Sequence, residues 1–171
     1  LKRFIDECHK RGIAVIFDMV LNHQFGQSPL VQLYWDSSNN RPSAENPWFN
    51  QVPKHDFNVG YDMNHESKLT QQFVDRVNRY WLEEFRFDGY RFDLSKGFMQ
   101  TGSFYDYNQS RTNLLKRMYD KVREYDSDAY MILEHLGANN EEIVLSDYGF
   151  MLWGKMTDPY NEATMGYHDG G

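Results

Sequence analysis

Hydrophobic positions along the chain fall into two alternating kinds of pattern. In one kind, apolar residues recur every three or four positions, as Phe73, Val77 and Trp81 do, which is typical of a helix with one buried stripe. The other kind is a nearly continuous apolar run such as IAVIFDMVLNH at 13–23, which is typical of a strand buried on both faces. These patterns predict helices at 1–11, 67–84, 110–125 and 139–146, and strands at 13–23, 89–94, 129–134 and 150–153.

This order of elements predicts an α/β fold with a parallel sheet, because each strand is followed by a crossover that contains a helix. Two architectures fit the pattern, an open doubly wound sheet and a (β/α)₈ barrel. No glycine-rich fingerprint follows any of the predicted strands, so a nucleotide-binding doubly wound sheet is poorly supported.

Residues 24–65 interrupt the alternation. They show no helical or strand periodicity, they hold four of the 5 prolines, and they are rich in aromatic residues. A structureless loop of this length is uncommon inside a domain unless it has a function. We therefore expect a small excursion, packed by its own aromatic side chains over one end of the sheet.

Composition narrows the classes of partner. The 171 residues carry a formal net charge of -7, which disfavours a polyanionic partner such as nucleic acid. No apolar run approaches the length of a membrane span, and the single cysteine excludes an internal disulfide framework. Aromatic residues make up 16% of the chain, and such rings often line sugar-binding clefts as well as filling cores.

Polar residues gather where three of the predicted strands end. The first strand ends with Asp18, Asn22 and His23, the second with Arg91 and Asp93, and the third with Glu134 and His135. Each of these has an ordinary structural explanation when taken alone, such as a turn, a salt bridge or a solvated rim. Their recurrence at one end of parallel strands favours an active site, because that is where such folds place their catalytic residues.

Strand geometry and charge suggest a division of roles. Side chains alternate between the two faces of a strand, so Arg91 and Asp93 share one face, opposite Tyr90, Phe92 and Leu94. If the first strand is regular, Asp18 and Asn22 also share a face.

Two carboxyl groups in one cleft suit glycoside hydrolysis, in which one is ionised and the other carries a proton. The cation of Arg91 favours the ionised form of Asp93. Glu134 has no sequence neighbour that is a cation except His135, so it is the better proton carrier. The separation of the two carboxyl groups, and with it the stereochemistry, stays open at this point.

Three segments resemble ordered signature regions of the alpha-amylase superfamily, glycoside hydrolase family 13. They are DMVLNH at 18–23, GYRFDLSKGF at 89–98 and ILEHLG at 132–137. The resemblance implies a (β/α)₈ catalytic barrel and a retaining, covalent mechanism on α-glucosidic bonds of starch-like glucans. It makes this chain an incomplete internal part of the barrel, roughly strands three to six. Residues 1–23 then hold a helix and the third strand, 24–66 a domain-B-like insertion, and 67–171 the continuation of the barrel.

The resemblance also implies roles for single residues. Asp93 is the nucleophile and Glu134 the general acid/base, while Arg91 orients Asp93 and keeps it ionised, His23 and Lys96 bind sugar, Asp18 braces the arginine, and Asn22 helps to hold a structural calcium. No cofactor is implied for the chemistry itself. Oligosaccharide or polysaccharide is the implied substrate, and secretion or a periplasmic location is expected by analogy.

The chain departs from the family pattern in two places. Gly97 follows Lys96 where the family often has histidine, which affects the contact on the leaving side of the sugar. The family's Asn-His-Asp segment of the seventh strand is absent, and the pair His168-Asp169 follows no strand-like run, so it is not assigned that role. We therefore expect the rest of a parent barrel to be required and this piece alone to be inactive.

Three other functions compete with an α-glucan hydrolase. The first is an enzyme of the same fold with a different outcome, such as transglycosylation, branching, debranching or trehalose chemistry. The second is a non-catalytic carbohydrate-binding relative, although Arg91, Asp93 and Glu134 are all present. The third is a metal hydrolase, for which the chain offers residues but no tight ligand spacing: His23, His55, Asp56 and His65.

Overall fold

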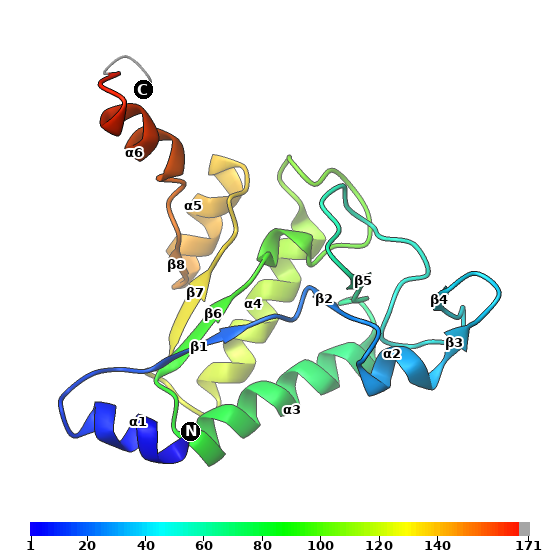
Figure 1. Ribbon diagram of the computed structural model, residues 1–171, viewed down its shortest axis with the longest axis horizontal. Helices are drawn as coiled ribbons and strands as arrows, with labels where there is room; N and C mark the ends of the chain where they lie inside the picture. The colour runs from blue at the N-terminus through cyan, green and yellow to red at the C-terminus, as the bar shows by residue number, and fades with distance from the viewer. Residues whose placement is uncertain (168–171) are drawn as a thin grey trace.

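A parallel sheet of four strands organises the computed structural model, which describes residues 1–167 (Figure 1). The strands are β1 (Ile16–Met19), β6 (Gly89–Phe92), β7 (Tyr130–Leu133) and β8 (Met151–Leu152), and they lie side by side in sequence order. In the register of the central pairs, Asp18 lies opposite Arg91, and Arg91 lies opposite Ile132. The predicted α/β fold with a parallel sheet is therefore confirmed.

Three helices cover one face of this sheet. They are α3 (Lys68–Phe85), α4 (Gln109–Arg123) and α5 (Asn139–Tyr148), each of which connects one strand to the next. The side chains of Tyr90 and Phe92 are fully buried against them, as the sequence pattern predicted. On the opposite face Val20, Tyr130 and Met151 are 45%, 46% and 51% exposed. The described residues thus leave that face of the sheet uncovered.

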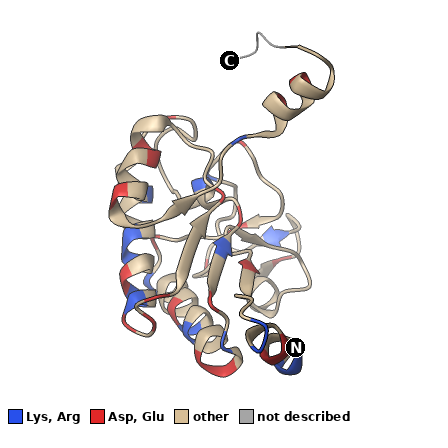
Figure 2. Cartoon of the chain, turned by 90° about the vertical axis from the view of Figure 1, so that its left-hand side faces the viewer, with Lys and Arg blue, Asp and Glu red and all other residues tan. Residues whose placement is uncertain are grey.

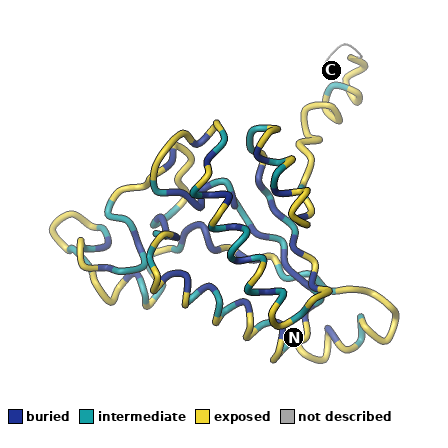
Figure 3. The backbone as a smooth tube through the Cα atoms, turned by 180° about the vertical axis from the view of Figure 1, so that it is seen from behind, coloured by how far each residue is buried: buried dark blue, intermediate teal, exposed yellow. Residues whose placement is uncertain are grey.

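The remaining helices lie outside this core. Helix α1 (Lys2–His9) precedes β1 and contacts the end of α3 through the ion pair between Lys2 and Glu84. Helix α6 (Thr157–Thr164) projects away from the rest of the chain and is exposed over nearly its whole length (Figures 1 and 3). Charged residues of both signs are interspersed along the helices (Figure 2). Among the described residues, no helix has the length and apolarity needed to cross a membrane.

The predicted bounds of the first strand and the predicted buried face of α3 differ from the structure. The run at 13–23 is not one strand, because β1 ends at Met19 and residues His23–Gln24 form β2, which pairs antiparallel with β5 (Tyr61–Asp62). In α3 the buried residues include Thr70, Val74, Asn78 and Leu82. The predicted stripe of Phe73, Val77 and Trp81 is only partly buried, although it packs against the same core. The aromatic side chains are long enough to reach the edge of the sheet, so Trp81 stacks on Phe17 while smaller residues fill the centre.

Residues 24–65, predicted as an excursion, pack on a small core of their own. It contains β2 and β5 together with α2 (Pro29–Leu33), β3 (Trp35–Asp36) and β4 (Arg41–Pro42). Val31, Phe49 and Met63 are buried at its centre, surrounded by partly buried aromatic rings. Its chain returns over the carboxyl ends of the strands, which brings its side chains to the site described next (Figure 1).

Candidate active site

Arg91 lies at the centre of the polar residues that end the strands. Its Nη1 donates to Asp18 Oδ1 at 2.6 Å and to Asp93 Oδ1 at 2.9 Å. Its Nη2 lies 2.9 Å from Glu134 Oε2, and the guanidinium covers the ring of Trp153 at 4.3 Å. Burial opposes the charge of Arg91, but its contacts with Asp18, Glu134 and Asp93 outweigh burial and raise its pKa. One guanidinium thus joins three acidic side chains that come from three neighbouring strands.

The surroundings of Glu134 differ from the prediction. His135 is the only candidate cation adjacent to Glu134 in the sequence, yet Arg91 of the neighbouring strand pairs with Glu134 directly. The reason is that β6 and β7 are paired neighbours in the sheet, so the side chain of Arg91 in β6 reaches Glu134, the residue that follows β7. His135 borders the cleft but is almost fully buried, and its ring bonds Ser95 and Glu141. The amide of Leu94 also donates to Glu134 Oε2, at 3.1 Å.

A pocket of about 610 Å³ opens beside this arginine, and Asp93 and Glu134 both line it. His23 and Lys96 line it too, so four of the predicted site residues border one cavity. The other walls come from the insertion and from the loop after β6: Phe57, Val59, Phe104 and Tyr105. Sequence reasoning did not single out these four residues, although the aromatic content of their segments was a signal for them.

Leu94 also lines the pocket, which corrects its predicted place among the core residues. The strand ends at Phe92, and Leu94 has a left-handed backbone with φ of 45°. The chain then continues into the short 3₁₀ helix η1 (Ser95–Gly97). This turn redirects the side chain of Leu94 from the helices to the cleft, because strand alternation no longer applies after β6.

Lys96 and His23 stand at the pocket with different partners. Lys96 Nζ donates to Leu136 O at 2.9 Å and lies over the rings of Phe104 and Tyr105 at 4.4 and 5.5 Å. Burial lowers the pKa of Lys96. Burial also lowers the pKa of His23 and outweighs the opposing charge of Asp93. A neutral His23 ring can both donate and accept a hydrogen bond.

Asn22 does not share a face with Asp18, contrary to the expectation for a regular strand. It is fully buried, because the chain has left the sheet after Met19 to enter the insertion. Its Oδ1 lies 3.3 Å from His23 Nδ1, and its Nδ2 lies 3.3 Å from His55 Nε2. His55 in turn lies 3.4 Å from Asp62 Oδ1, with both side chains fully buried. The insertion is thereby tied to the end of β1.

These partners do not form a calcium site as they stand. Calcium takes six to eight oxygen ligands, whereas the side chain of Asn22 faces two imidazole rings. Residues 1–167 contain no group of three or more His, Cys, Asp or Glu side chains placed to hold a metal ion. The calcium at Asn22 therefore stays a prediction, and no step below depends on it.

The metal-hydrolase alternative finds no support in the positions of its residues. His65 Nε2 donates to Leu21 O at 2.7 Å and its ring stacks on Phe98, and burial lowers its pKa to about 4. His55 lies against Phe104, with 5.2 Å between ring centroids. Both rings thus serve packing at the base of the insertion. The pair His168-Asp169 lies outside the described residues.

Gly97 marks a close approach that explains its departure from the family pattern. A Cβ atom at this position would lie 2.0 Å from Asn22 Nδ2 and 2.8 Å from His55 Nε2. The space that a side chain would need is thus already filled by Asn22 and by a histidine of the insertion. A glycine here is therefore a packing requirement of this chain.

Replacement of Gly97 by alanine is expected to lower the free energy of unfolding by about 1–3 kcal/mol, because a methyl group is forced against buried side chains. Urea unfolding of the purified protein measures this change. Gly26→Ala is the matched control, since its added Cβ meets nothing closer than Tyr61 Cε2 at 3.8 Å. Equal midpoints for the two variants would contradict the close packing around Gly97.

Comparisons with known proteins, by sequence and by structure, both find similar proteins. No protein-family model matches the chain. Isoamylase 1 of Arabidopsis thaliana chloroplasts is 31% identical over 109 residues, which are 61% of this chain and 13% of that protein. The structure of Eubacterium rectale Amy13B matches with a TM-score of 0.67 and 24% identity, over 90% of this chain and 34% of that one.

A third relative is known with a bound sugar. The pullulanase of Anoxybacillus sp. LM18-11, complexed with maltotriose, matches with a TM-score of 0.54 and 25% identity, over 78% of this chain and 17% of that one. The chain therefore spans about a third or less of the length of these proteins. These likenesses in sequence and fold agree with the resemblance of the three ordered motifs to the alpha-amylase superfamily, glycoside hydrolase family 13.

Proposed function

We propose that this chain forms the central part of the catalytic barrel of a glycoside hydrolase that cleaves α-glucosidic bonds in starch-like glucans with retention. The observation that carries the proposal is the contact of one guanidinium, that of Arg91, with both Asp93 and Glu134 beside a pocket of about 610 Å³. A retaining glycosidase needs two such carboxyl groups in one cleft, one as nucleophile and one as acid/base.

The sheet supports a barrel over a doubly wound fold. A doubly wound sheet carries helices on both faces, whereas α3, α4 and α5 all cover one face here. The opposite face, with Tyr130 and Met151, would point inward in a closed barrel. We assign β1, β6, β7 and β8 to roughly strands three to six, and residues 24–66, which have their own core, to a domain-B-like insertion.

In the first step Asp93 attacks the anomeric carbon, the bond from that carbon to the glycosidic oxygen breaks, and Glu134 gives its proton to this oxygen, so that the leaving sugar departs as an alcohol. Arg91 holds Asp93 through Oδ1, which leaves Oδ2 to form the covalent bond to the sugar. At Glu134, both Arg91 Nη2 and the Leu94 amide point at Oε2. An oxygen that faces two donors must accept, so the transferable proton resides on Oε1.

In the second step Glu134 takes a proton from an acceptor, which attacks the anomeric carbon and releases Asp93. Water as acceptor gives hydrolysis, and a sugar hydroxyl gives transglycosylation or branching. The two outcomes share every residue described above. Asp18, whose carboxylate bonds Arg91 Nη1, braces the guanidinium through both steps.

The lining of the pocket supports a sugar as the bound group. Phe57 and Tyr105 are 59% and 63% exposed and border the cavity, so their rings are available to stack on a pyranose. His23 and Lys96 add polar groups to the lining of the same pocket. The complex of the similar pullulanase with maltotriose supports an α-glucan oligosaccharide as the class of ligand.

The proposal is tested on the protein that contains this chain within its whole barrel. Proton NMR of a freshly started reaction with maltoheptaose should show the α-anomer of the new reducing end first. Release of the β-anomer first would rule out retention, and the absence of any cleavage or transfer would rule out the enzyme assignment. Chromatography of the products separates hydrolysis from transfer, because only transfer yields chains longer than the substrate.

The role of Tyr105 gives a further prediction for the same assay. Tyr105→Ala should raise KM for maltoheptaose by roughly threefold to tenfold, the size of one aromatic contact, with little change in kcat. Tyr160 in α6 is a matched control, because it is 64% exposed and does not line the pocket. If both variants have the KM of the unchanged protein, Tyr105 does not bind the sugar.

A further inference from the structure

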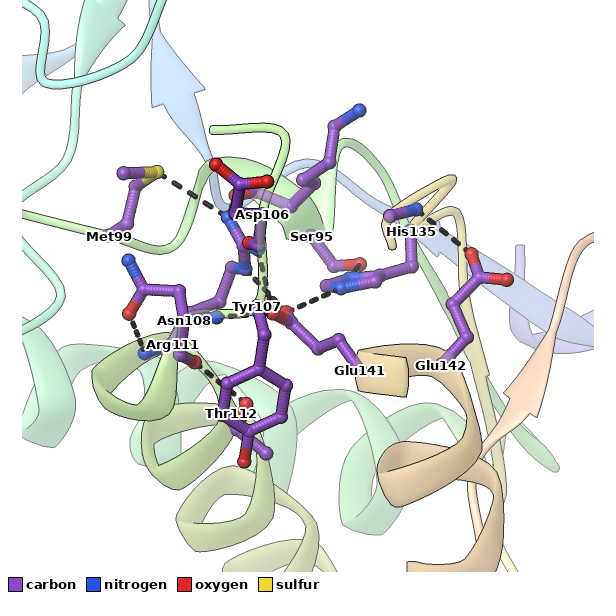
Figure 4. A network of polar contacts seen from close by, with 12 residues as sticks. Ser95, Met99, Asp106, Tyr107, Asn108, Arg111, Thr112, His135, Glu141 and Glu142 are labelled. Carbon is purple, nitrogen blue, oxygen red and sulfur yellow. Dashed lines mark hydrogen bonds and ion pairs between the residues drawn. The ribbon is translucent and has the colours of Figure 1, made fainter. Parts of the chain in front are cut away.

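A second group of charged side chains lies beneath the pocket, on the helix side of the sheet. Arg111 of α4 and Glu141 of α5 are fully buried and form a two-pronged ion pair (Figure 4). Arg111 Nε lies 2.6 Å from Glu141 Oε1, and Nη2 lies 2.8 Å from Oε2. Neither residue lines the pocket, and the chemistry proposed above does not use them.

Arg111 holds the two loops that carry pocket residues. Its Nη1 donates to the carbonyl of Lys96 at 3.0 Å, and its Nη2 donates to the carbonyl of Asp106 at 2.9 Å. Lys96 itself lines the pocket, and Asp106 directly follows Tyr105. The position of both loops is thus fixed by one buried side chain.

Glu141 extends the network to the residue proposed as the acid/base. Its Oε1 accepts from His135 Nε2 at 2.8 Å, and its Oε2 accepts from the amide of Asn108 at 2.6 Å. The other nitrogen of His135, Nδ1, lies 3.0 Å from Ser95 Oγ. Ser95 then contacts the carbonyl of Glu134 twice, through Oγ at 3.2 Å and through its amide at 3.1 Å.

The charges of this pair are maintained in the interior. Burial opposes ionisation of Glu141, but hydrogen bonds from His135 and Arg111 outweigh it and lower its pKa to about 2. Glu141 is therefore an acceptor over the whole range in which a glycosidase works. Buried ion pairs contribute little net stability compared with apolar side chains of the same size, so a positional role is the better explanation for keeping one here.

We propose that Arg111 and Glu141 are positioning residues for the acid/base, because they fix Glu134 through His135 and Ser95 and fix the loop at Lys96 directly. This inference rests on the proposed function. Proton transfer to the leaving oxygen depends on placing the Glu134 carboxyl group within hydrogen-bond reach of it. A small displacement of its backbone therefore lowers the rate without unfolding the protein.

The leaving group of the substrate separates this role from general support of the fold. The sugar that departs from a glucan is a poor leaving group, so its departure needs the proton of Glu134. Fluoride departs from α-maltosyl fluoride without that proton. Both substrates need Asp93. In each case kcat/KM reports the first step, because formation of the covalent intermediate is the first irreversible event.

The test is the double variant Arg111→Met/Glu141→Leu in the protein with its whole barrel. Removing both charges together avoids leaving one of them buried without its partner. We expect kcat/KM for maltoheptaose to fall by roughly tenfold to a hundredfold and that for α-maltosyl fluoride to change by less than about threefold. The matched control is Arg117→Met/Asp75→Leu, which removes a two-pronged pair between α3 and α4 and should alter neither value.

Equal losses on both substrates, or no loss on either, would overturn the inference. If the double variant does not fold, Ser95→Ala decides, because it keeps the ion pair and removes only the hydroxyl, which contacts both His135 Nδ1 and the carbonyl of Glu134. It should lower kcat/KM for maltoheptaose alone. Glu134→Gln serves as the reference: if it shows no difference between the two substrates, the acid/base assignment fails. If Glu134→Gln shows a difference between the two substrates and the other variants show none, only the positioning role fails.

Discussion

Asp93→Asn is expected to lower kcat for maltoheptaose cleavage by roughly ten thousandfold or more, because an amide cannot form the glycosyl ester. In the unchanged protein Arg91 Nη1 donates to both Asp18 and Asp93. The substitution keeps the size of the side chain at position 93 and leaves an oxygen there that can still accept from Arg91. The circular dichroism spectrum and thermal midpoint should therefore change little. The rate is measured by release of reducing ends.

A control and a second readout make this result specific. Asp36→Asn is the matched control, because the side chain of Asp36 is 22% exposed and that of Asp93 is 27% exposed. Asp36 lies in the insertion and does not line the pocket. This variant should keep normal turnover. Mass spectrometry with a 5-fluoro glucosyl fluoride should detect a covalent adduct on the unchanged protein and none on Asp93→Asn. Near-normal turnover of Asp93→Asn would remove the nucleophile assignment.

Glu134→Gln is expected to lower kcat/KM for maltoheptaose by about a hundredfold to ten thousandfold. The amide oxygen can still accept from the Leu94 amide, but the group has no acidic proton to give to the leaving oxygen. The value for α-maltosyl fluoride should stay within about threefold, because fluoride needs no proton. Stopped assays on both substrates with the same enzyme preparation measure the difference.

A matched variant for Glu134 is Glu142→Gln. Glu142 lies in the first turn of α5 and accepts from the amide of Gly137, near the same end of the sheet, but it does not line the pocket. It should behave as the unchanged protein on both substrates. A loss of similar size on both substrates for Glu134→Gln would mean that Glu134 supports the site without transferring a proton.

The elements of the sheet and its helices could be predicted because their hydrophobic patterns are local. The β6 pattern placed Tyr90 and Phe92 toward the helices, and both are fully buried there. The prediction failed where the chain leaves regular structure. Leu94 adopts a left-handed turn and Asn22 follows a departure from the sheet, so neither obeys the alternation of the strand before it.

The sequence by itself determined the α/β order and the gathering of Asp18, Arg91, Asp93 and Glu134 at one end of the strands, since parallel strands bring their carboxyl ends to the same edge. Only the tertiary structure decided which charges touch. It pairs Arg91 with Glu134, fits His55 against Gly97, and buries Arg111 with Glu141 under the pocket. These contacts join residues that are 30 to 43 positions apart in the sequence. The elements that carry them meet only through strand pairing and helix packing. A local pattern carries no information about such distances, which is why the gathering of these side chains could be predicted and the contacts that support them could not.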